Sequence, residues 1–228
     1  MVFKLFRRLF RRSPLDLVSI EELRERKIEL ENMVRKVKSK IEEIDKEMEL
    51  VLESAESVET KLDEMILARK LKGLELEKTF KLGTQAKLER ELRIVSNLII
   101  VKEYQKDLES AGAWDKLKKM DPIIIVTWLE ERNFEEMSRD EIISQVVAMT
   151  SGAIEVNYRE YKPVVTPTSR EQWIEQRIGE LFEDSDEPFK VERDVIRAIK
   201  EGKMEVRDAK RVIDLVCYYY MKMRHDYC

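Results

Sequence analysis

Few residues in this sequence could carry chemistry, and their spacing does not form a recognisable catalytic or metal site. The single histidine, His225, lies between Cys217 and Cys228 near the end of the chain. Thiolates and imidazoles are zinc ligands, but a structural zinc site takes four ligands and this set offers three. The sequence contains no Walker loop, nucleophile elbow or dinucleotide-binding fingerprint. We therefore expect no enzyme, no cofactor and no bound metal.

The clearest pattern of residue types is in the first twelve residues, which form an amphipathic helix when placed on a helical wheel. The apolar face carries Val2, Phe3, Leu5, Phe6, Leu9 and Phe10. The basic face carries Lys4, Arg7, Arg8, Arg11 and Arg12. Ser13-Pro14 ends the segment, because proline disfavours helical geometry in the residue before it. We predict an amphipathic N-terminal helix over residues 1–13.

A helix this short is marginal in water, so it needs a surface on which to fold. An anionic membrane suits the pattern, with Phe3, Phe6, Leu9 and Phe10 inserted and the arginines on lipid phosphates. Docking onto the protein's own body or a sister subunit is the first alternative. A basic arm that stacks on nucleic acid is the second alternative, less favoured because the aromatic and basic residues are separated onto two faces.

The composition indicates long exposed helices. Charged residues make up 39% of the chain, aromatic residues 7%, and the formal net charge is −4. Such a balance gives no overall field that would attract nucleic acid. No apolar run approaches the ~20 residues that span a bilayer, and no secretory hydrophobic region follows the basic start. We expect a cytoplasmic, all-α protein that is peripheral on membrane.

A heptad pattern begins at Leu23 and predicts a coiled-coil region over residues 19–110. Its a and d positions are Leu23, Lys27, Leu30, Val34, Val37, Ile41, Ile44, Met48, Val51, Ala55, Val58, Leu62 and Met65. Ser19 and Glu22 form a capping box at its start. The region is either an antiparallel hairpin or one very long helix reaching about Ser110. Gly83-Thr84 is the preferred break, and Ser54–Ser57 is the rival turn, although the heptad continues through it.

Charge alternates in blocks along this region. Residues 26–40 are basic, residues 42–64 are acidic and residues 69–93 are basic again. Alternating blocks allow staggered copies, or the two arms of a hairpin, to pair with opposite sign. A solvated helix face is the better explanation of any single block, but the succession of three favours ordered self-association.

The second half of the chain predicts shorter helices over residues 111–152, a linker over 153–168 and a three-helix unit over 169–228. Ala111-Gly112-Ala113 ends the long region. Helix starts are expected at Asp121-Pro122, leading a buried helix over 123–137, and at the Ser138 and Glu141 capping box. The last helices are expected at 189–200 and 206–223, joined by Glu201-Gly202-Lys203.

This layout resembles that of ESCRT-III-type membrane-remodelling proteins, including those of archaeal cell division. The shared features are the Phe/Leu/Arg helix at 2–12, the long helical region, the shorter helices and a proline-bearing linker. The resemblance implies polymerisation on membranes through stacked hairpins, and an AAA ATPase as a partner. Pro163, Val164, Val165 and Pro167 are similar to the proline-type motif that recruits this ATPase. The sequence departs from the family pattern where the heptad runs past the usual turn of the first hairpin.

Taken together, the sequence predicts a self-assembling peripheral membrane scaffold that is not an enzyme. The alternatives are a soluble coiled-coil adaptor or structural subunit, and a nucleic-acid- or ribosome-associated factor that uses the basic blocks.

Overall fold

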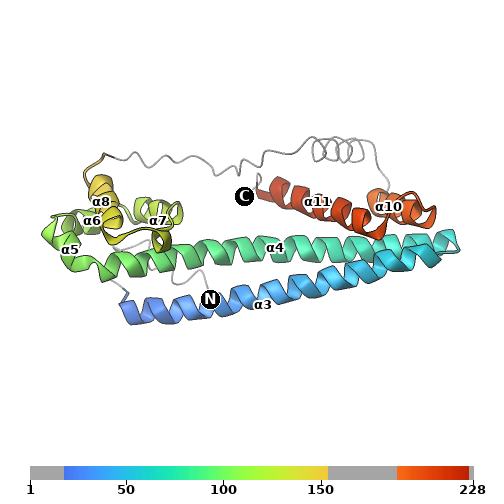
Figure 1. Ribbon diagram of the computed structural model, residues 1–228, viewed down its shortest axis with the longest axis horizontal. Helices are drawn as coiled ribbons and strands as arrows, with labels where there is room; N and C mark the ends of the chain where they lie inside the picture. Colours follow the sequence, from blue (N-terminus) through green and yellow to red (C-terminus); the bar gives the residue numbers. More distant parts are fainter. Residues whose placement is uncertain (1–17, 154–188, 226–228) are drawn as a thin grey trace. The chain divides into compact units, whose positions relative to one another are not determined.

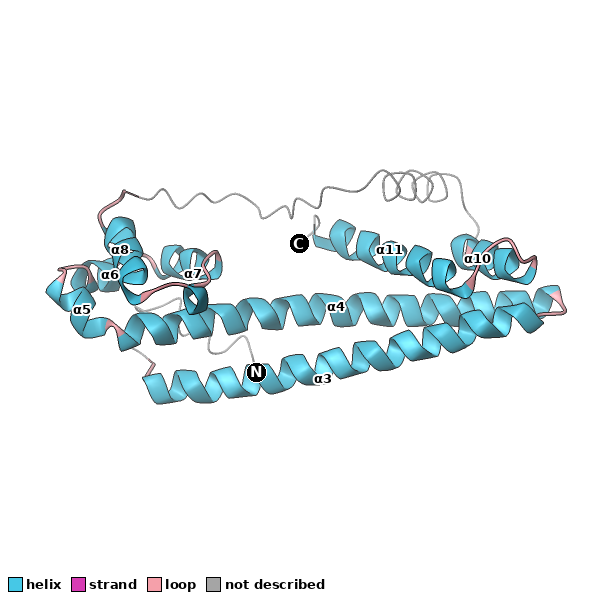
Figure 2. Ribbon diagram, in the orientation of Figure 1, coloured by secondary structure: helices cyan, strands magenta, loops and turns pink. Residues whose placement is uncertain are grey.

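The computed structural model describes residues 18–153 and 189–225, and every regular element in these ranges is a helix. The predicted all-α fold is confirmed, and Figure 2 shows the helices within each of the two ranges joined by short loops. The chain divides into two compact units that alternate along the sequence. The described part of the first unit is 18–35 with 86–153, and that of the second is 36–85 with 189–225. Both long helices, which span residues 20–53 and 61–103, contribute to both units.

The first long helix, α3, spans Ile20–Glu53 and begins at the predicted capping box. The Ser19 amide donates to Glu22 Oε2 at 2.8 Å, and the Glu22 amide donates to Ser19 Oγ at 3.1 Å. These two bonds satisfy amides that have no partner inside the helix. The prediction of the helix start is therefore confirmed.

The chain reverses direction between residues 54 and 60, where the heptad had suggested continuity. A single 3₁₀ turn, η1 (Ser54–Ser57), follows α3, and the second long helix, α4, spans Lys61–Glu103. Ser54 Oγ donates to the Leu50 carbonyl at 2.7 Å, and the Asp63 amide donates to Thr60 Oγ1 at 3.1 Å. Side-chain bonds of this kind compete with helix continuation and then cap the next helix. The antiparallel alternative is correct, and within each unit the α3 and α4 segments lie side by side (Figure 1).

The preferred break at Gly83-Thr84 is wrong, because α4 runs through both residues. Thr84 Oγ1 donates to the Phe80 carbonyl at 2.9 Å, a bond made inside a continuous helix. A glycine in a helix interior costs only about 1 kcal/mol relative to alanine. The packing of α4 residues on either side, such as the buried Leu74 and Leu88, outweighs that cost.

In the first unit, the beginning of α3 packs antiparallel to the end of α4. Arg26 pairs with Glu91 at 2.6 Å, and Arg24 pairs with Glu103 at 2.7 Å. Beyond α4, three short helices pack against one another: α5 (Gln105–Ser110), α6 (Trp114–Lys119) and α8 (Arg139–Thr150). Gly112, at φ +66°, follows the end of α5, whereas the long helix that it was predicted to end stops earlier, at Glu103.

The helix predicted over 123–137 is shorter than expected. Helix α7 spans Pro122–Glu130, with Asp121 as its N-cap, and a separate 3₁₀ turn, η2, covers Phe134–Glu136. This turn places Phe134 against Trp128 in an edge-to-face contact with ring centroids 5.2 Å apart. Burying both rings therefore requires the helix to end between them.

Asn97 on α4 holds this end of α7 in place. Its side chain is 1% exposed and donates to the carbonyls of Leu129 at 2.6 Å and Arg132 at 2.9 Å. Its Oδ1 accepts from the Phe134 amide at 3.2 Å. One side chain thus binds three backbone groups between the end of α7 and the start of η2, where the Leu129 carbonyl also accepts from the Arg132 amide at 3.4 Å.

The second unit surrounds one apolar core. Helices α10 (Lys190–Lys200) and α11 (Val206–His225) contribute Val195, Ile196 and Ile213 to it. The core also contains side chains from α3, η1 and α4, among them Met48, Ala55 and Leu71. Rather than belonging to a three-helix unit of their own, α10 and α11 therefore pack onto the neighbouring parts of α3 and α4. The first helix expected for that unit, after residue 169, lies outside the described residues.

We predict that Asn97→Leu lowers the free energy of unfolding by about 2–4 kcal/mol, because buried backbone groups lose their partners. Urea unfolding followed by circular dichroism measures this change. Asn133→Ala is the matched control, since Asn133 is exposed and caps η2 with no side-chain hydrogen bond. Equal stability of Asn97→Leu and the unaltered chain would contradict the role assigned to Asn97.

Candidate interaction sites and buried charge clusters

The residues predicted to bind membrane lie outside the described residues. This holds for Phe3, Phe6, Leu9, Phe10, Arg7, Arg8, Arg11 and Arg12. It also holds for Pro163, Val164, Val165 and Pro167 of the partner motif, and for Cys228. The predictions made for these residues remain predictions.

Most of the predicted seam is buried by the chain itself. The buried positions are Leu30, Val34, Ile41, Ile44, Met48, Val51 and Val58. Val37 is half-buried, whereas Leu62 is 66% exposed. The change at Leu62 follows from the reversal at 54–60, since the face of α4 that continues the heptad points away from the core. The seam as predicted is therefore interrupted at the turn.

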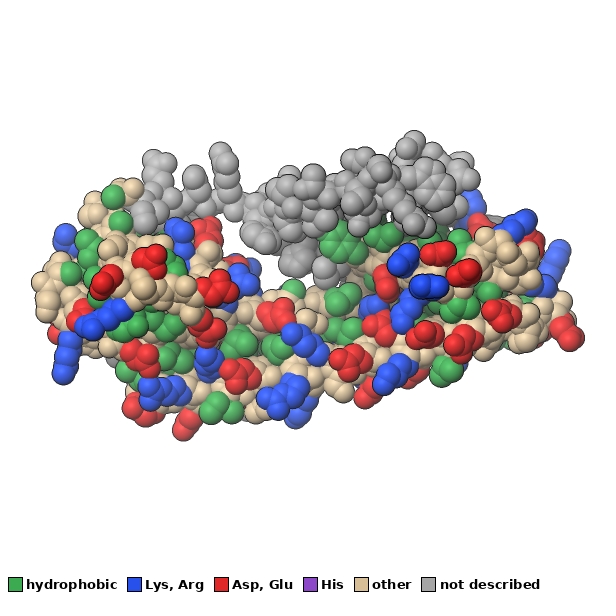
Figure 3. Space-filling view, viewed as in Figure 1, with side chains coloured by type: hydrophobic (Ala, Val, Ile, Leu, Met, Phe, Trp, Pro, Cys, Tyr) green, Lys and Arg blue, Asp and Glu red, His purple; other side chains and the backbone are tan. Residues whose placement is uncertain are grey.

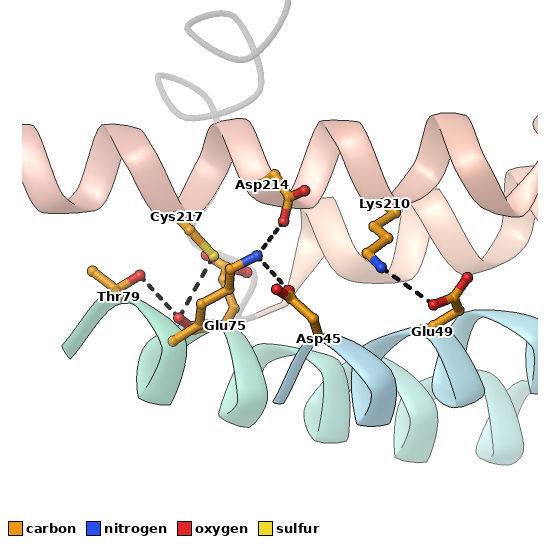
Figure 4. A network of polar contacts seen from close by, with 8 residues as sticks. Asp45, Glu49, Glu75, Thr79, Lys210, Asp214 and Cys217 are labelled. Carbon is orange, nitrogen blue, oxygen red and sulfur yellow. Dashed lines mark hydrogen bonds and ion pairs between the residues drawn. The ribbon is translucent and has the colours of Figure 1, made fainter. Parts of the chain in front are cut away.

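Lys78 on α4 joins three helices of the second unit through two carboxylates. Its Nζ lies 2.5 Å from Asp45 Oδ1 of α3 and 2.6 Å from Asp214 Oδ1 of α11. Figure 4 shows both carboxylates directed to one shared point between their helices. Burial opposes the charge of Lys78, but the hydrogen bonds to Asp214 and Asp45 outweigh it and raise the pKa of Lys78. The ammonium group is therefore a fixed structural charge, and a second pair, Lys210 with Glu49, also links α11 to α3.

Cys217 lies beside this network and is buried in the apolar core. Its thiol lies 3.6 Å from the Glu75 carbonyl, which also accepts from Thr79 Oγ1 at 2.9 Å (Figure 4). Burial, reinforced by the charge of Glu75, raises the pKa of Cys217 to about 12. The thiolate needed for nucleophilic or metal chemistry is therefore disfavoured. Within the described ranges, no three Cys, His, Asp or Glu side chains lie close enough together to hold a metal.

A second buried cluster joins α4 to α10. Glu75 is 0% exposed and Glu192 is 2% exposed, and Lys72 pairs with both at 3.0 and 2.9 Å. One cation thus faces two carboxylates. Burial raises the pKa of Glu75 to about 8, and the hydrogen bond to Glu192 adds to the rise. A proton shared between the two carboxyl groups is the arrangement that this cluster favours.

The first unit contains ion pairs of its own, around Arg26 and Lys27. The Arg26 guanidinium is held by Glu91 and Glu29. Lys27, the one polar residue in the predicted seam, pairs with Glu135 at 2.8 Å, and this hydrogen bond lowers the pKa of Glu135. A shallow depression of about 490 Å³ beside this pair is lined mostly by charged and polar side chains. Such a surface lacks the apolar enclosure that small-molecule sites usually have.

The buried charges were not predicted from the sequence, although α4 contains a signal for them. Glu75 and Lys78 stand four and seven residues after the buried Leu71, on the face that also carries Leu74. A charged residue at a core position of a helix is expected to meet an opposite charge. The clusters therefore fix how helices pair, and none of them combines a nucleophile with a general base.

Comparisons with known proteins add no relative. No family model matches the chain, and no curated protein or solved structure matches it either. In the part of the chain that the structure describes, no helix combines the length and apolar character that crossing a bilayer requires.

We predict that stability falls as the pH rises, because Glu75 has a folded-state pKa of about 8 against an ordinary value of 4.5. Between these two values the folded state retains a proton that the unfolded state has lost, so the slope approaches about 1.4 kcal/mol per pH unit. Glu75→Gln removes this dependence and stabilises the protein most above pH 8. Thermal unfolding at a series of pH values measures both effects.

The matched control is Glu91→Gln, which neutralises a buried carboxylate that already pairs with Arg26. We expect that change to destabilise the protein, since the guanidinium loses its partner. If Glu75→Gln destabilised the protein as Glu91→Gln does, the protonated state assigned to Glu75 would be wrong.

Proposed function

We propose that this chain is a self-assembling peripheral membrane scaffold of ESCRT-III type that is not an enzyme. The observation that carries the proposal is the separation of residue types in residues 2–12, where all six apolar residues share one face and all five basic residues share the other. An interface between an apolar phase and water stabilises a helix whose apolar and basic residues are separated in this way.

The energetic argument favours an anionic surface. Each basic residue near an anionic membrane contributes about 1 kcal/mol, and the apolar face adds the burial of three phenylalanines, Phe3, Phe6 and Phe10. Docking onto protein would use the aromatic face but would also need acidic groups opposite Arg7, Arg8, Arg11 and Arg12. The phosphates of an anionic membrane supply those negative charges, so no complementary acidic surface on a partner protein is needed.

The described helices are consistent with a structural role. The reversal between α3 and α4, followed by short helices, supports the proposal of a scaffold built on helical hairpins. The buried charges of both units are used to join helices, as the Lys78 and Arg26 clusters illustrate. Figure 3 shows acidic and basic side chains interleaved over the helices in view, and a surface of that kind does not attract nucleic acid broadly.

Two partners follow from the proposal. The first is the chain itself, because a scaffold acts by assembling. The second is an AAA ATPase that would bind the segment containing Pro163, Val164, Val165 and Pro167 and take the assembly apart. Both contacts would form on the cytoplasmic leaflet, where anionic lipids are concentrated.

We predict that the full chain floats with liposomes containing phosphatidylserine and that a chain lacking residues 1–13 does not. Replacing Phe3, Phe6, Leu9 and Phe10 by serine should abolish flotation, because the basic face alone binds only weakly and loses its lipids as salt is raised. Neutral liposomes are the lipid control. The Phe→Ser chain, which keeps every positive charge, is the control for simple attraction.

Equal flotation with and without residues 1–13 would remove the membrane proposal. If neither chain floats and the protein forms a discrete small oligomer, the adaptor alternative is the correct one.

A further inference from the structure

One face of α4 in the second unit is apolar and exposed. Its side chains are Leu62 (66% exposed), Met65 (56%), Ile66 (56%), Leu76 (51%) and Phe80 (65%). Residues 62, 66, 69, 73, 76 and 80 follow one another in alternating steps of four and three, so they lie along one side of the helix. We call this side the Gly73 face. An aligned set of large apolar side chains in water is typical of an interaction surface.

Gly73 stands at the centre of this face with no role inside its own chain. A Cβ added to it would meet no atom within 4 Å. Glycine in a helix interior costs about 1 kcal/mol relative to alanine, and nothing in the described chain offsets that cost at this position. A glycine on an exposed apolar face does allow a second helix to approach closely.

We infer that the Gly73 face binds the same face of a second copy, with the two α4 helices antiparallel and crossing at Gly73. In this arrangement each residue that follows Gly73 in one copy lies opposite a residue that precedes Gly73 in the other copy. The two residues are the same number of positions from Gly73. Phe80 then packs against the partner's Ile66, and the partner's Phe80 packs against Ile66. Both aromatic rings, which are exposed in one copy, become buried in the pair.

Charge complementarity selects this occupant and this direction. Four residues on either side of Gly73 stand Arg69 and Glu77, both exposed, and Glu77 also lies close enough to Lys40 of α3 to interact with its charge. Antiparallel pairing places Arg69 opposite the partner's Glu77, and it does so twice. Parallel pairing would instead set Arg69 against the partner's Arg69 and glutamate against glutamate.

The contact deepens the self-assembly part of the proposed function and rests on it, but it needs no lipid. The helix from residue 62 to residue 84 is about 35 Å long at ~1.5 Å per residue, which limits the buried area to a modest interface. A modest contact is suited to a scaffold, since many such contacts add up when copies are held on one surface.

Sedimentation velocity of the full chain over a range of concentrations tests the inference. We expect a dimer that weakens at least tenfold in Arg69→Glu and at least tenfold in Glu77→Arg, because each change puts like charges together twice. The double variant Arg69→Glu/Glu77→Arg should recover the affinity of the unaltered chain. Residues 69 and 77 are two helical turns apart in one chain, so this rescue comes from the pairing between copies.

The glycines supply a second, independent pair of variants. Gly73→Gln should abolish the dimer, whereas Gly83→Gln should leave it intact, because Gly83 lies off the centre of the face. Neither new side chain meets an atom of its own chain at Cβ, so both variants should keep the fold, as circular dichroism will check.

Two outcomes would overturn the inference. One is a chain that sediments as a monomer at every concentration. The other is a dimer that is unaffected by Gly73→Gln, or that the double charge exchange fails to restore. Flotation of the same variants separates the two proposals: a dimer behaving as expected without flotation leaves the Gly73 pairing standing and removes the membrane scaffold.

Discussion

The structure depends on one constraint: an apolar stripe on a long, highly charged helix must be covered by another helix. Alone, α3 would expose Leu30, Ile44 and Met48, which are all buried here. The chain meets the constraint by reversing at 54–60 and laying α4 against α3 within each unit. The short helices cover apolar side chains in the same way. In the second unit α10 and α11 cover the core that α3 and α4 share, and in the first unit α5, α6 and α8 pack against one another.

Apolar burial does not specify which residue meets which, and the buried polar groups supply that information. The two ion pairs of Lys78 form only in the helix register that brings Asp45 and Asp214 to its ammonium group. The ion pair of Arg26 likewise needs Glu91 of α4 to lie beside the start of α3. Asn97 does the same for the end of α7 through three backbone contacts. The cluster around Glu75 is different, because both carboxylates that share its lysine, those of Glu75 and Glu192, are almost fully buried. The unit therefore retains a proton and gains a dependence on pH that an apolar core would not have.

Local chemistry made much of the fold predictable. The capping boxes at Ser19 and Ser138, the N-cap at Asp121 and the glycine end at Gly112 are confirmed, since each depends on a few neighbouring residues. Of the two turns considered, the rival at Ser54–Ser57 is correct and the preferred break at Gly83-Thr84 is wrong, because the heptad continues through the true reversal in sequence. Serine and threonine bonds near residues 54–63 outweigh that pattern, and a continuous heptad does not register them. The ion pairs of Lys78 join residues far apart in the chain, so neither composition nor periodicity could identify the partners.

Apolar side chains serve two kinds of surface: those that close the two units, and those that we propose are left for assembly, at residues 2–12 and along the Gly73 face. We propose that the second kind serves ordered assembly on a membrane. Electron microscopy of the purified chain with and without anionic liposomes tests this proposal. We expect regular coats or filaments on the liposome surface. Discrete particles that leave bare liposomes unchanged would contradict it.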